Sequence, residues 1–261
     1  MRPLAEFVGA KRVRGLLFDI DDTLTTDGVL GAGAYAAMER LQRSGRLLVA
    51  VTGRPAGWCD LVARLWPVDA VIGENGAFWF ARAGRRVERC WLDDAATRAA
   101  NRARLAAIGA RILAAVPGAA LAADQPWRET DLAVDWCEDV QPPLSLETAL
   151  RVRDLMVAEG LSAKVSSIHV NGWFGRYDKL ETAKRLFAER YRVDLARANA
   201  DYAFVGDSPN DAPMFAFFGN SIGVANVRRF EGRLEAAPRY VTRAPAGAGF
   251  AEVAAHLLGG R

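Results

Sequence analysis

The sequence predicts an α/β protein: a Rossmann-like three-layer core with a mainly parallel sheet, interrupted by an inserted α+β domain. Two patterns carry this prediction. Short apolar runs alternate with amphipathic stretches in the first and last parts of the chain, as in a parallel sheet covered by helices. In the middle, strands with polar–apolar alternation are typical of an antiparallel unit. We expect a discontinuous core over 1–81 and 176–261, and an inserted domain over 82–175.

The first part of the chain predicts strands that alternate with helices. Gly45 ends the first helix and Pro55 stands near the start of the second, which are favoured positions for these residues. Asn75 and Gly76 form a turn between the third strand and a further short strand. The expected elements are strand 14–20, helix 32–45, strand 46–53, helix 54–66 and two strands within 69–80.

The character of the chain changes after residue 82 and changes back after Tyr177. The middle block is expected to contain a hairpin at 83–92, helix 93–115, strand 129–136, helix 145–160 and one or two strands within 161–175. The last part returns to the first pattern, with helix 179–191, strand 201–208, helix 210–219, strand 220–226, helix 228–237, strand 239–242 and helix 250–258.

The composition limits the class of protein. The chain has 261 residues, 51% of them hydrophobic, which is enough for one large or two ordinary domains. It has no apolar run that resembles a membrane span or a signal peptide. The three cysteines have no paired or metal-type spacing, so we expect reduced thiols and a cytoplasmic location. The small net charge of +3 is spread along the chain, which argues against nucleic acid as a partner.

Histidine and lysine are both scarce. There are only two histidines, so acid–base chemistry here is expected to rely on carboxylates. Only four of the 34 Lys and Arg residues are lysines, so a lysine at a key position is less often accidental than usual.

Polar residues follow three predicted strands at the point where each ends. Asp19 and Asp21 end the first strand, Thr52 and Gly53 end the second, and Asp207 ends a strand late in the chain. In an open parallel sheet, ligands bind outside the carboxyl ends of the strands, and residues two apart on a strand share a face. We therefore expect Asp19 and Asp21 to point into one crevice, which Asp207 joins from a neighbouring strand.

These residue types predict a magnesium site that handles phosphate. Carboxylates brought close together repel one another, and Mg²⁺ relieves the repulsion because it prefers oxygen ligands. Thr52, before a helix start, offers a hydroxyl and backbone N–H groups to an anion, and Lys179 supplies a positive charge. The set fits phosphoryl transfer, in which Asp19 attacks phosphorus. Asp21 then protonates the leaving group and afterwards activates water.

Four segments resemble the motifs of the haloacid dehalogenase-like (HAD) superfamily. In the family's order they are DIDDT at 19–23, VTGR at 51–54, YDKLETA at 177–183 and GDSPND at 206–211. The insertion lies between the second and third motifs, at the position of the family's type II caps. IGENGAFWF at 72–80 is similar to subgroup IIB, which includes Cof-like sugar phosphatases, sucrose-phosphatase-like enzymes and mannosyl-3-phosphoglycerate phosphatases.

The resemblance implies a role for each matching residue. Asp19 is the nucleophile and Asp21 the acid/base. The phosphoryl group is held by Thr52, Gly53, Lys179 and Asn210. Mg²⁺ is bound by Asp19, Asp207 and the backbone carbonyl of Asp21, with support from Asp211.

Further positions are expected to contact the substrate or depart from the family. Asn75 and Gly76 are expected at the substrate entrance, and Arg128 and His169 of the predicted cap are candidate substrate contacts, with packing as the competing interpretation. Two departures occur, because Asp22 and Leu180 stand where the family commonly has glycine.

The leading hypothesis is a Mg²⁺-dependent phosphomonoesterase of a small phosphorylated metabolite, acting through an aspartyl-phosphate. Neutral residues beside Arg128 would suit a sugar phosphate, and a cluster of arginines a phosphoglycerate-type acid. A phosphomutase with the same nucleophile is the alternative. A non-enzymatic phospho-receiver is a third hypothesis, which the acid/base at Asp21 disfavours. The oligomeric state is left open.

Overall fold

Nine strands form the main sheet of the computed structural model, which describes residues 1–259. Their order is β1-β13-β12-β11-β2-β3-β4-β5-β6, parallel from β1 to β4 and antiparallel over β4–β5 and β5–β6. The strands are β1 Arg2–Pro3, β2 Gly15–Phe18, β3 Leu47–Val51, β4 Ala70–Gly73, β5 Phe78–Ala83, β6 Arg86–Trp91, β11 Tyr202–Gly206, β12 Ser221–Gly223 and β13 Tyr240–Val241.

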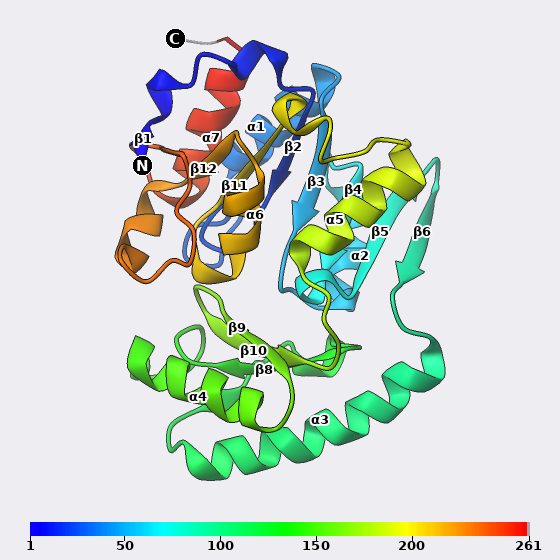
Figure 1. The fold of residues 1–261 in the computed structure, drawn as a ribbon, viewed down its shortest axis with the longest axis vertical. Helices are drawn as coiled ribbons and strands as arrows, with labels where there is room; N and C mark the ends of the chain where they lie inside the picture. The colour runs from blue at the N-terminus through cyan, green and yellow to red at the C-terminus, as the bar shows by residue number, and fades with distance from the viewer. Residues whose placement is uncertain (260–261) are drawn as a thin grey trace.

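Two helical layers cover this sheet, because successive side chains of each strand point to opposite faces. Leu16 and Phe18 of β2 pack in a buried cluster with α1, α2 and α7, whereas Leu17 packs in a second cluster with α5 and α6. The helices are α1 Ala32–Arg43, α2 Ala56–Leu65, α5 Lys179–Leu186, α6 Ala212–Phe217 and α7 Ala246–Leu257. The predicted three-layer α/β core with a mainly parallel sheet is confirmed (Figure 1).

A second, antiparallel sheet lies below the first in Figure 1, with its two helices on the far side. Its strand order is β7-β8-β10-β9. Val134 and Val170 pack on these helices, so the alternate residues Asp131, His169 and Asn171 face the main sheet. The elements are α3 Ala95–Ala115, β7 Ala120–Leu121, β8 Asp131–Asp135, α4 Leu146–Ala158, β9 Ser162–Val165 and β10 His169–Trp173.

The structure differs from the predicted elements in two places. The hairpin predicted over 83–92 forms as β5 and β6, but it extends the main sheet, which therefore runs ten residues past the predicted boundary at 81 to Trp91. Hydrophobic periodicity alone does not tell which sheet a hairpin joins. The short helix predicted over 228–237 is wrong: a 3-10 helix spans Ala225–Phe230, and the chain turns at Gly232 with a φ of +80°.

Short helical segments complete the fold. The predicted helix 179–191 is α5 followed by a π-helical turn over Phe187–Tyr191, which Arg192 ends with a φ of +57°. Six more 3-10 segments are Leu4–Glu6, Ala10–Arg12, Glu74–Gly76, Gln125–Trp127, Asn199–Asp201 and Pro209–Asp211. None of the helices within residues 1–259 is long and apolar enough to cross a membrane.

Candidate active site

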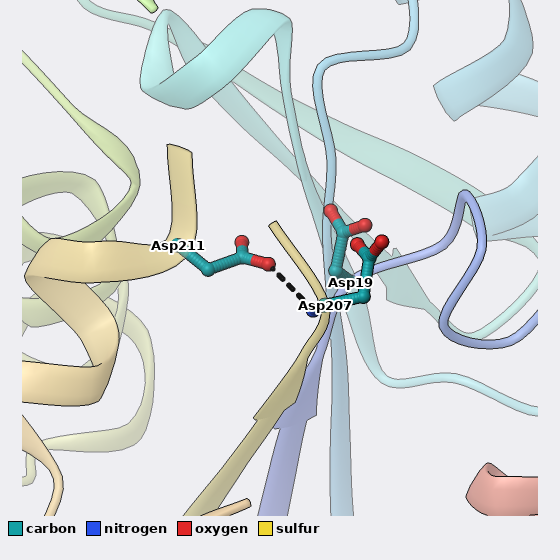
Figure 2. Close-up of side chains that lie close together, drawn as sticks. All are labelled: Asp19, Asp207 and Asp211. Atoms are coloured by element: carbon teal, nitrogen blue, oxygen red, sulfur yellow. Dashed lines mark hydrogen bonds between the residues drawn. The ribbon is translucent and has the colours of Figure 1, made fainter. Parts of the chain in front are cut away.

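Two neighbouring parallel strands deliver the central carboxylates. Asp19 follows β2 and Asp207 follows β11, and the backbone N–H of Asp19 donates to the carbonyl of Val205 at 2.9 Å. Figure 2 shows their carboxylates side by side at the strand ends, with Asp211 reaching toward them from the following helical turn. Carboxylate oxygens of the three residues lie within 4.8 Å of one another, and all three residues are buried.

Lys179 connects this cluster to the start of α5. Its Nζ lies 2.7 Å from Asp19 Oδ1 and 2.7 Å from Asp211 Oδ1. Asp178 caps the helix by accepting the backbone N–H of Glu181, which fixes the first turn that carries the lysine. Burial opposes the charge on Lys179, but the two aspartates outweigh burial and raise the pKa of the ammonium above its ordinary value.

The electrostatics of the cluster fit a divalent cation. Burial, with the nearby Asp211 and Asp21, raises the pKa of Asp19 to about 8 although Lys179 opposes this. Burial and the charges of Asp19 and Asp211 raise the pKa of Asp207 well above its usual range. The buried ammonium of Lys179 and the guanidinium of Arg229, which also pairs with Asp22, do not fully neutralise three buried carboxylates. Carboxylate oxygens are the donors that Mg²⁺ prefers. The residues present therefore fit Mg²⁺.

Asp211 is fixed by backbone donors. Its Oδ2 accepts N–H groups from Asp207 at 3.1 Å and Ser208 at 3.4 Å, and the first of these bonds is dashed in Figure 2. Gly206 permits this approach, because a Cβ at that position would collide with the Asp211 carboxylate. This close contact explains why the GDSPND segment begins with glycine.

Asp22, one of the two departures from the family pattern, keeps the backbone that glycine would favour. Its φ is +53°, and its carbonyl accepts from Asn226 Nδ2 at 2.9 Å. Its carboxylate pairs with Arg229 at 3.2 Å, and the same guanidinium lies 3.4 Å from Asp207. The added charge is therefore matched by an arginine that sequence reasoning missed. At the other departure, Leu180 packs against the buried cluster on the α5 face of the sheet.

Asp21 is held by Arg54 and not by the cluster. Arg54 Nε donates to the two Asp21 oxygens at 2.9 and 3.0 Å. From the cap side, Glu138 pairs with the guanidinium at 2.5 Å and Asp124 at 3.2 Å. Burial would lower the pKa of Arg54, but Asp21 and Glu138 more than offset burial and raise this pKa. The sequence identifies Arg54 only as a member of the VTGR motif. Its pairing with Asp124 and Glu138 could not be predicted, because these partners lie 70 and 84 residues away in the chain.

His169 reaches this network from β10. Its Nε2 lies 2.7 Å from Glu138 Oε2, and the imidazole is 2% exposed. Burial would raise the pKa of Glu138, but His169 and Arg54 lower it to about 2. The structure thus places His169 beside the candidate site, where its direct partner is Glu138.

Gly53 and Asn210, two of the predicted phosphate-binding residues, line a small cavity together with Asp19. Thr52 Oγ1 accepts the backbone N–H of Arg54 at 3.0 Å, and Asn210 Nδ2 donates to Asn75 Oδ1 at 3.4 Å. Asn75 Nδ2 is buried without a hydrogen-bond partner, and a Cβ on Gly53 would lie 3.2 Å from it. An unpaired buried amide donor and a glycine beside it suit an anion that approaches the backbone closely.

The space at this point is small. A cavity of about 10 Å³ is lined by Asp19 and Asp21 from the main domain and by His169 and Asn171 from the inserted one. This volume holds about one water molecule. A phosphoryl group is larger than this space.

Arg128 is placed differently from its prediction as a substrate contact. Its side chain is fully buried, and its donors go to Asp124, to Asp131 and to the carbonyl of Gly53 at 2.8 Å. The two aspartates occupy the guanidinium, so it ties the inserted domain to the loop after β3. Gly76 is also structural, since its carbonyl accepts from Thr182 and a Cβ on it would collide with the carbonyl of Asp178.

A larger pocket of about 530 Å³ adjoins Asp21 and is open to solvent. We call it the polar pocket. The main domain contributes Asp22, Asp27 and Arg229, and the inserted domain contributes Glu138 and Asp139.

Known proteins resemble this chain in structure but not detectably in sequence. No protein-family model and no curated protein matches the chain. A Thermoplasma acidophilum protein, 0175, is similar at TM-score 0.69 and 17% identity, over 94% of this chain and 98% of that one. The C-terminal domain of Candida albicans trehalose-6-phosphate phosphatase gives 0.68 and 13%, over 96% and 95%.

Sucrose-phosphatase from Synechocystis, in complex with sucrose and phosphate, gives a TM-score of 0.60 and 15% identity, over 94% of this chain and 98% of that one. Other similar structures are phosphatases or hydrolases of the HAD superfamily by their own descriptions. The chain therefore shares the fold of these structures, several of which are HAD-superfamily phosphatases or hydrolases by their own descriptions, and the fold expected from the resemblance is confirmed.

Proposed function

We propose that the protein is a Mg²⁺-dependent phosphomonoesterase that hydrolyses a sugar phosphate or a similar small ester through an aspartyl-phosphate on Asp19. The observation that carries the proposal is the buried set at the strand ends, in which Asp19 and Asp211 share Lys179 at 2.7 Å each beside Asp207. The phosphatases of the same fold support this reaction class.

In the proposed reaction each side chain has one task. Asp19 attacks phosphorus, and Lys179 holds a phosphoryl oxygen by its positive charge. Asp19, Asp207 and Asp211 would hold Mg²⁺, which when bound would neutralise negative charge on the phosphoryl oxygens. Asp21 gives its proton to the leaving oxygen, so that an alcohol departs, and then takes a proton from the water that hydrolyses the aspartyl-phosphate. Arg54 orients the Asp21 carboxylate through its two hydrogen bonds.

The polar pocket favours a leaving group without negative charge. Its lining contains five carboxylates, of Asp21, Asp22, Asp27, Glu138 and Asp139, against the guanidiniums of Arg54 and Arg229. Both guanidiniums already face carboxylates within the protein. A second phosphate or a carboxylate on the substrate would therefore meet repulsion. Of the two substrate types predicted from the sequence, this favours a neutral sugar over a phosphoglycerate-type acid.

The test is phosphate release from a panel of phosphorylated metabolites, with Mg²⁺ and with a chelator, and with Asp19→Asn as the blank. The panel contains the pair glucose 6-phosphate and 6-phosphogluconate, which differ by a carboxylate. We expect metal-dependent release that disappears in Asp19→Asn, with kcat/KM at least roughly tenfold higher for the neutral member because like charges repel. No release from any monoester would refute the phosphatase, and isomerisation without release would replace it by a mutase.

A further inference from the structure

A second cavity, of about 270 Å³, adjoins the candidate site between α2 and the loop that follows β2. We call it the apolar cavity. Asp21, Thr25, Gly28 and Arg54 line both this cavity and the polar pocket, so the two spaces meet at the acid/base. The rest of its lining is mainly apolar, with Ile20, Leu30, Trp58, Leu61, Val62 and Trp66.

The walls of the apolar cavity leave large apolar side chains in contact with water. Trp58 is 43% exposed and Leu61 is 51% exposed, both on the face of α2 that borders the cavity. The guanidinium of Arg54 lies 4.5 Å from the centre of the Trp58 ring, which holds the indole in place. Exposed apolar surface next to a preformed hollow of this size is typical of a small-molecule site.

The inserted domain contacts one of the residues that line the apolar cavity. Gly57, in the first turn of α2, lines it, and Trp127 packs on this glycine so closely that a Cβ there would come within 3.2 Å. The residues that line the apolar cavity all belong to the main domain, between Ile20 and Trp66, and Trp127 of the inserted domain packs against one of them.

The position of Asp21 connects this cavity to the chemistry. In the proposed reaction Asp21 protonates the leaving oxygen, so the first atoms of the leaving group lie beside the Asp21–Arg54 pair. From that point the polar pocket and the apolar cavity lead in two directions with opposite chemistry. A substituent on the leaving group would partition between them according to its polarity.

We propose that the apolar cavity is a second leaving-group subsite, which takes an alkyl or aromatic substituent, so that the protein also hydrolyses phosphate monoesters of alcohols with an apolar tail. This inference rests on the proposed function. It adds phosphate monoesters with an apolar leaving group to the sugar phosphates of the proposed function.

The test compares n-alkyl phosphates from ethyl to hexyl, because added methylenes leave the acidity of the departing alcohol almost unchanged. Burying a methylene contributes about 0.8 kcal/mol, which corresponds to about a fourfold rise in kcat/KM for each one until the cavity is full. A kcat/KM that stays constant or falls as the alkyl chain lengthens would overturn the proposal.

The location is tested by a matched pair of variants on α2. Leu61→Asn should flatten the alkyl series and leave turnover of glucose 6-phosphate unchanged. Leu65→Asn is the control, because Leu65 is 65% exposed, lies one turn further along the same helix face and is outside the lining of the cavity. The assignment would be overturned if kcat/KM still rose steeply with alkyl chain length in Leu61→Asn. It would also be overturned if this rise were lost equally in Leu65→Asn.

Binding separates this proposal from the proposed function. Titration calorimetry of Asp19→Asn with the same alkyl phosphates and Mg²⁺ measures Kd without turnover, and we expect Kd to fall with chain length. Tighter binding of longer esters without any turnover by the wild type would refute the phosphatase and leave the apolar subsite standing. Turnover of sugar phosphates with a Kd independent of chain length would refute the subsite alone.

Discussion

Two aspartates separated by one residue have different surroundings. Asp19 lies in the buried acidic cluster beside Lys179, whereas Asp21 is paired with Arg54. The nucleophile of the proposed reaction is thus kept next to the candidate metal site, and the acid/base next to the polar pocket. Division of two carboxylates between two environments is how proteins assign them different roles.

Arg54→Lys tests how the acid/base is oriented. Lysine keeps the positive charge but cannot hold both Asp21 oxygens in a fork as Arg54 does at 2.9 and 3.0 Å. We expect kcat on the best sugar phosphate to fall roughly 10–100-fold, since misplaced catalytic groups cost about that much. Arg64→Lys on the surface of α2, where Arg64 pairs only with Asp60, should leave kcat unchanged. An unaltered kcat in Arg54→Lys would contradict the orienting role.

Glu138→Gln tests the network between the two domains. The pKa of Glu138 is about 2 in the folded protein against an ordinary 4.5, so its ionised form contributes to stability above pH 4.5 and this contribution is lost as the pH falls toward 2. The difference corresponds to about 3–4 kcal/mol as an upper bound, which solvent screening of the partly exposed carboxylate reduces. We expect the free energy of unfolding of the variant to be lower than that of the wild type at pH 7. The gap between the two free energies should narrow from about pH 5 downward.

Denaturant unfolding at several pH values measures this gap. Glu189→Gln is the control, because Glu189 forms an exposed pair with Arg185 on the surface. A gap that stays constant with pH would mean that the Glu138 carboxylate is not ionised preferentially in the folded state.

At the scale of elements, the loop after β4 is fixed against the start of α5. Gly76 has a φ of +116°, and a Cβ on it would collide with the carbonyl of Asp178, just before Lys179. This close approach sets where the α5 lysine stands relative to the strand ends. Asn75, with a φ of +55°, carries the same loop toward Asn210.

Gly76→Ala should therefore cost more than about 2 kcal/mol, combining a strained backbone with displacement of α5. Gly84→Ala is the matched control, since Gly84 has a φ of +62° in the β5–β6 turn with nothing within 4 Å of a Cβ, and should cost only about 1 kcal/mol. Thermal unfolding and kcat together check the expectation. Equal destabilisation by the two variants, with kcat unaffected in both, would contradict it.

Local patterns and long-range contacts differ in how far the sequence predicts them. Asp19 and Asp207 were expected at one sheet edge because each ends an apolar strand, and parallel strands share that edge. The partners of Arg54 and the burial of Arg128 depend on how the inserted domain docks, which no local periodicity encodes. The hairpin at β5 and β6 was found from its pattern, but not the sheet that it joins.

At the scale of the whole molecule, the acidic cluster would couple binding of a metal ion to stability. The pKa of Asp207 lies well above its ordinary value because of burial and the charges of Asp19 and Asp211, so its ionised form destabilises the metal-free protein at neutral pH. A dication at the cluster would offset this penalty. Stability should then depend on Mg²⁺.

We expect Mg²⁺ at 100 times its Kd to raise the free energy of unfolding by about 3 kcal/mol, measured as a rise in Tm. Asp207→Asn should raise the Tm of the metal-free protein and abolish the response to Mg²⁺. Asp154→Asn, at an exposed aspartate on α4, should change neither. A full Mg²⁺ response in Asp207→Asn would place the metal elsewhere.

The central claim is that Asp19 becomes phosphorylated, and the most direct measurement is to trap that species. Asp21→Asn should accumulate it from a substrate whose leaving group departs without a proton, such as p-nitrophenyl phosphate, because then only the proposed hydrolysis step needs Asp21. After brief reaction with a turned-over substrate, acid quenching and digestion, mass spectrometry should find the phosphoryl group on the peptide that contains Asp19. A phosphoryl group on another residue would contradict the account. So would turnover by the wild type if Asp19 is labelled neither in the wild type nor in Asp21→Asn.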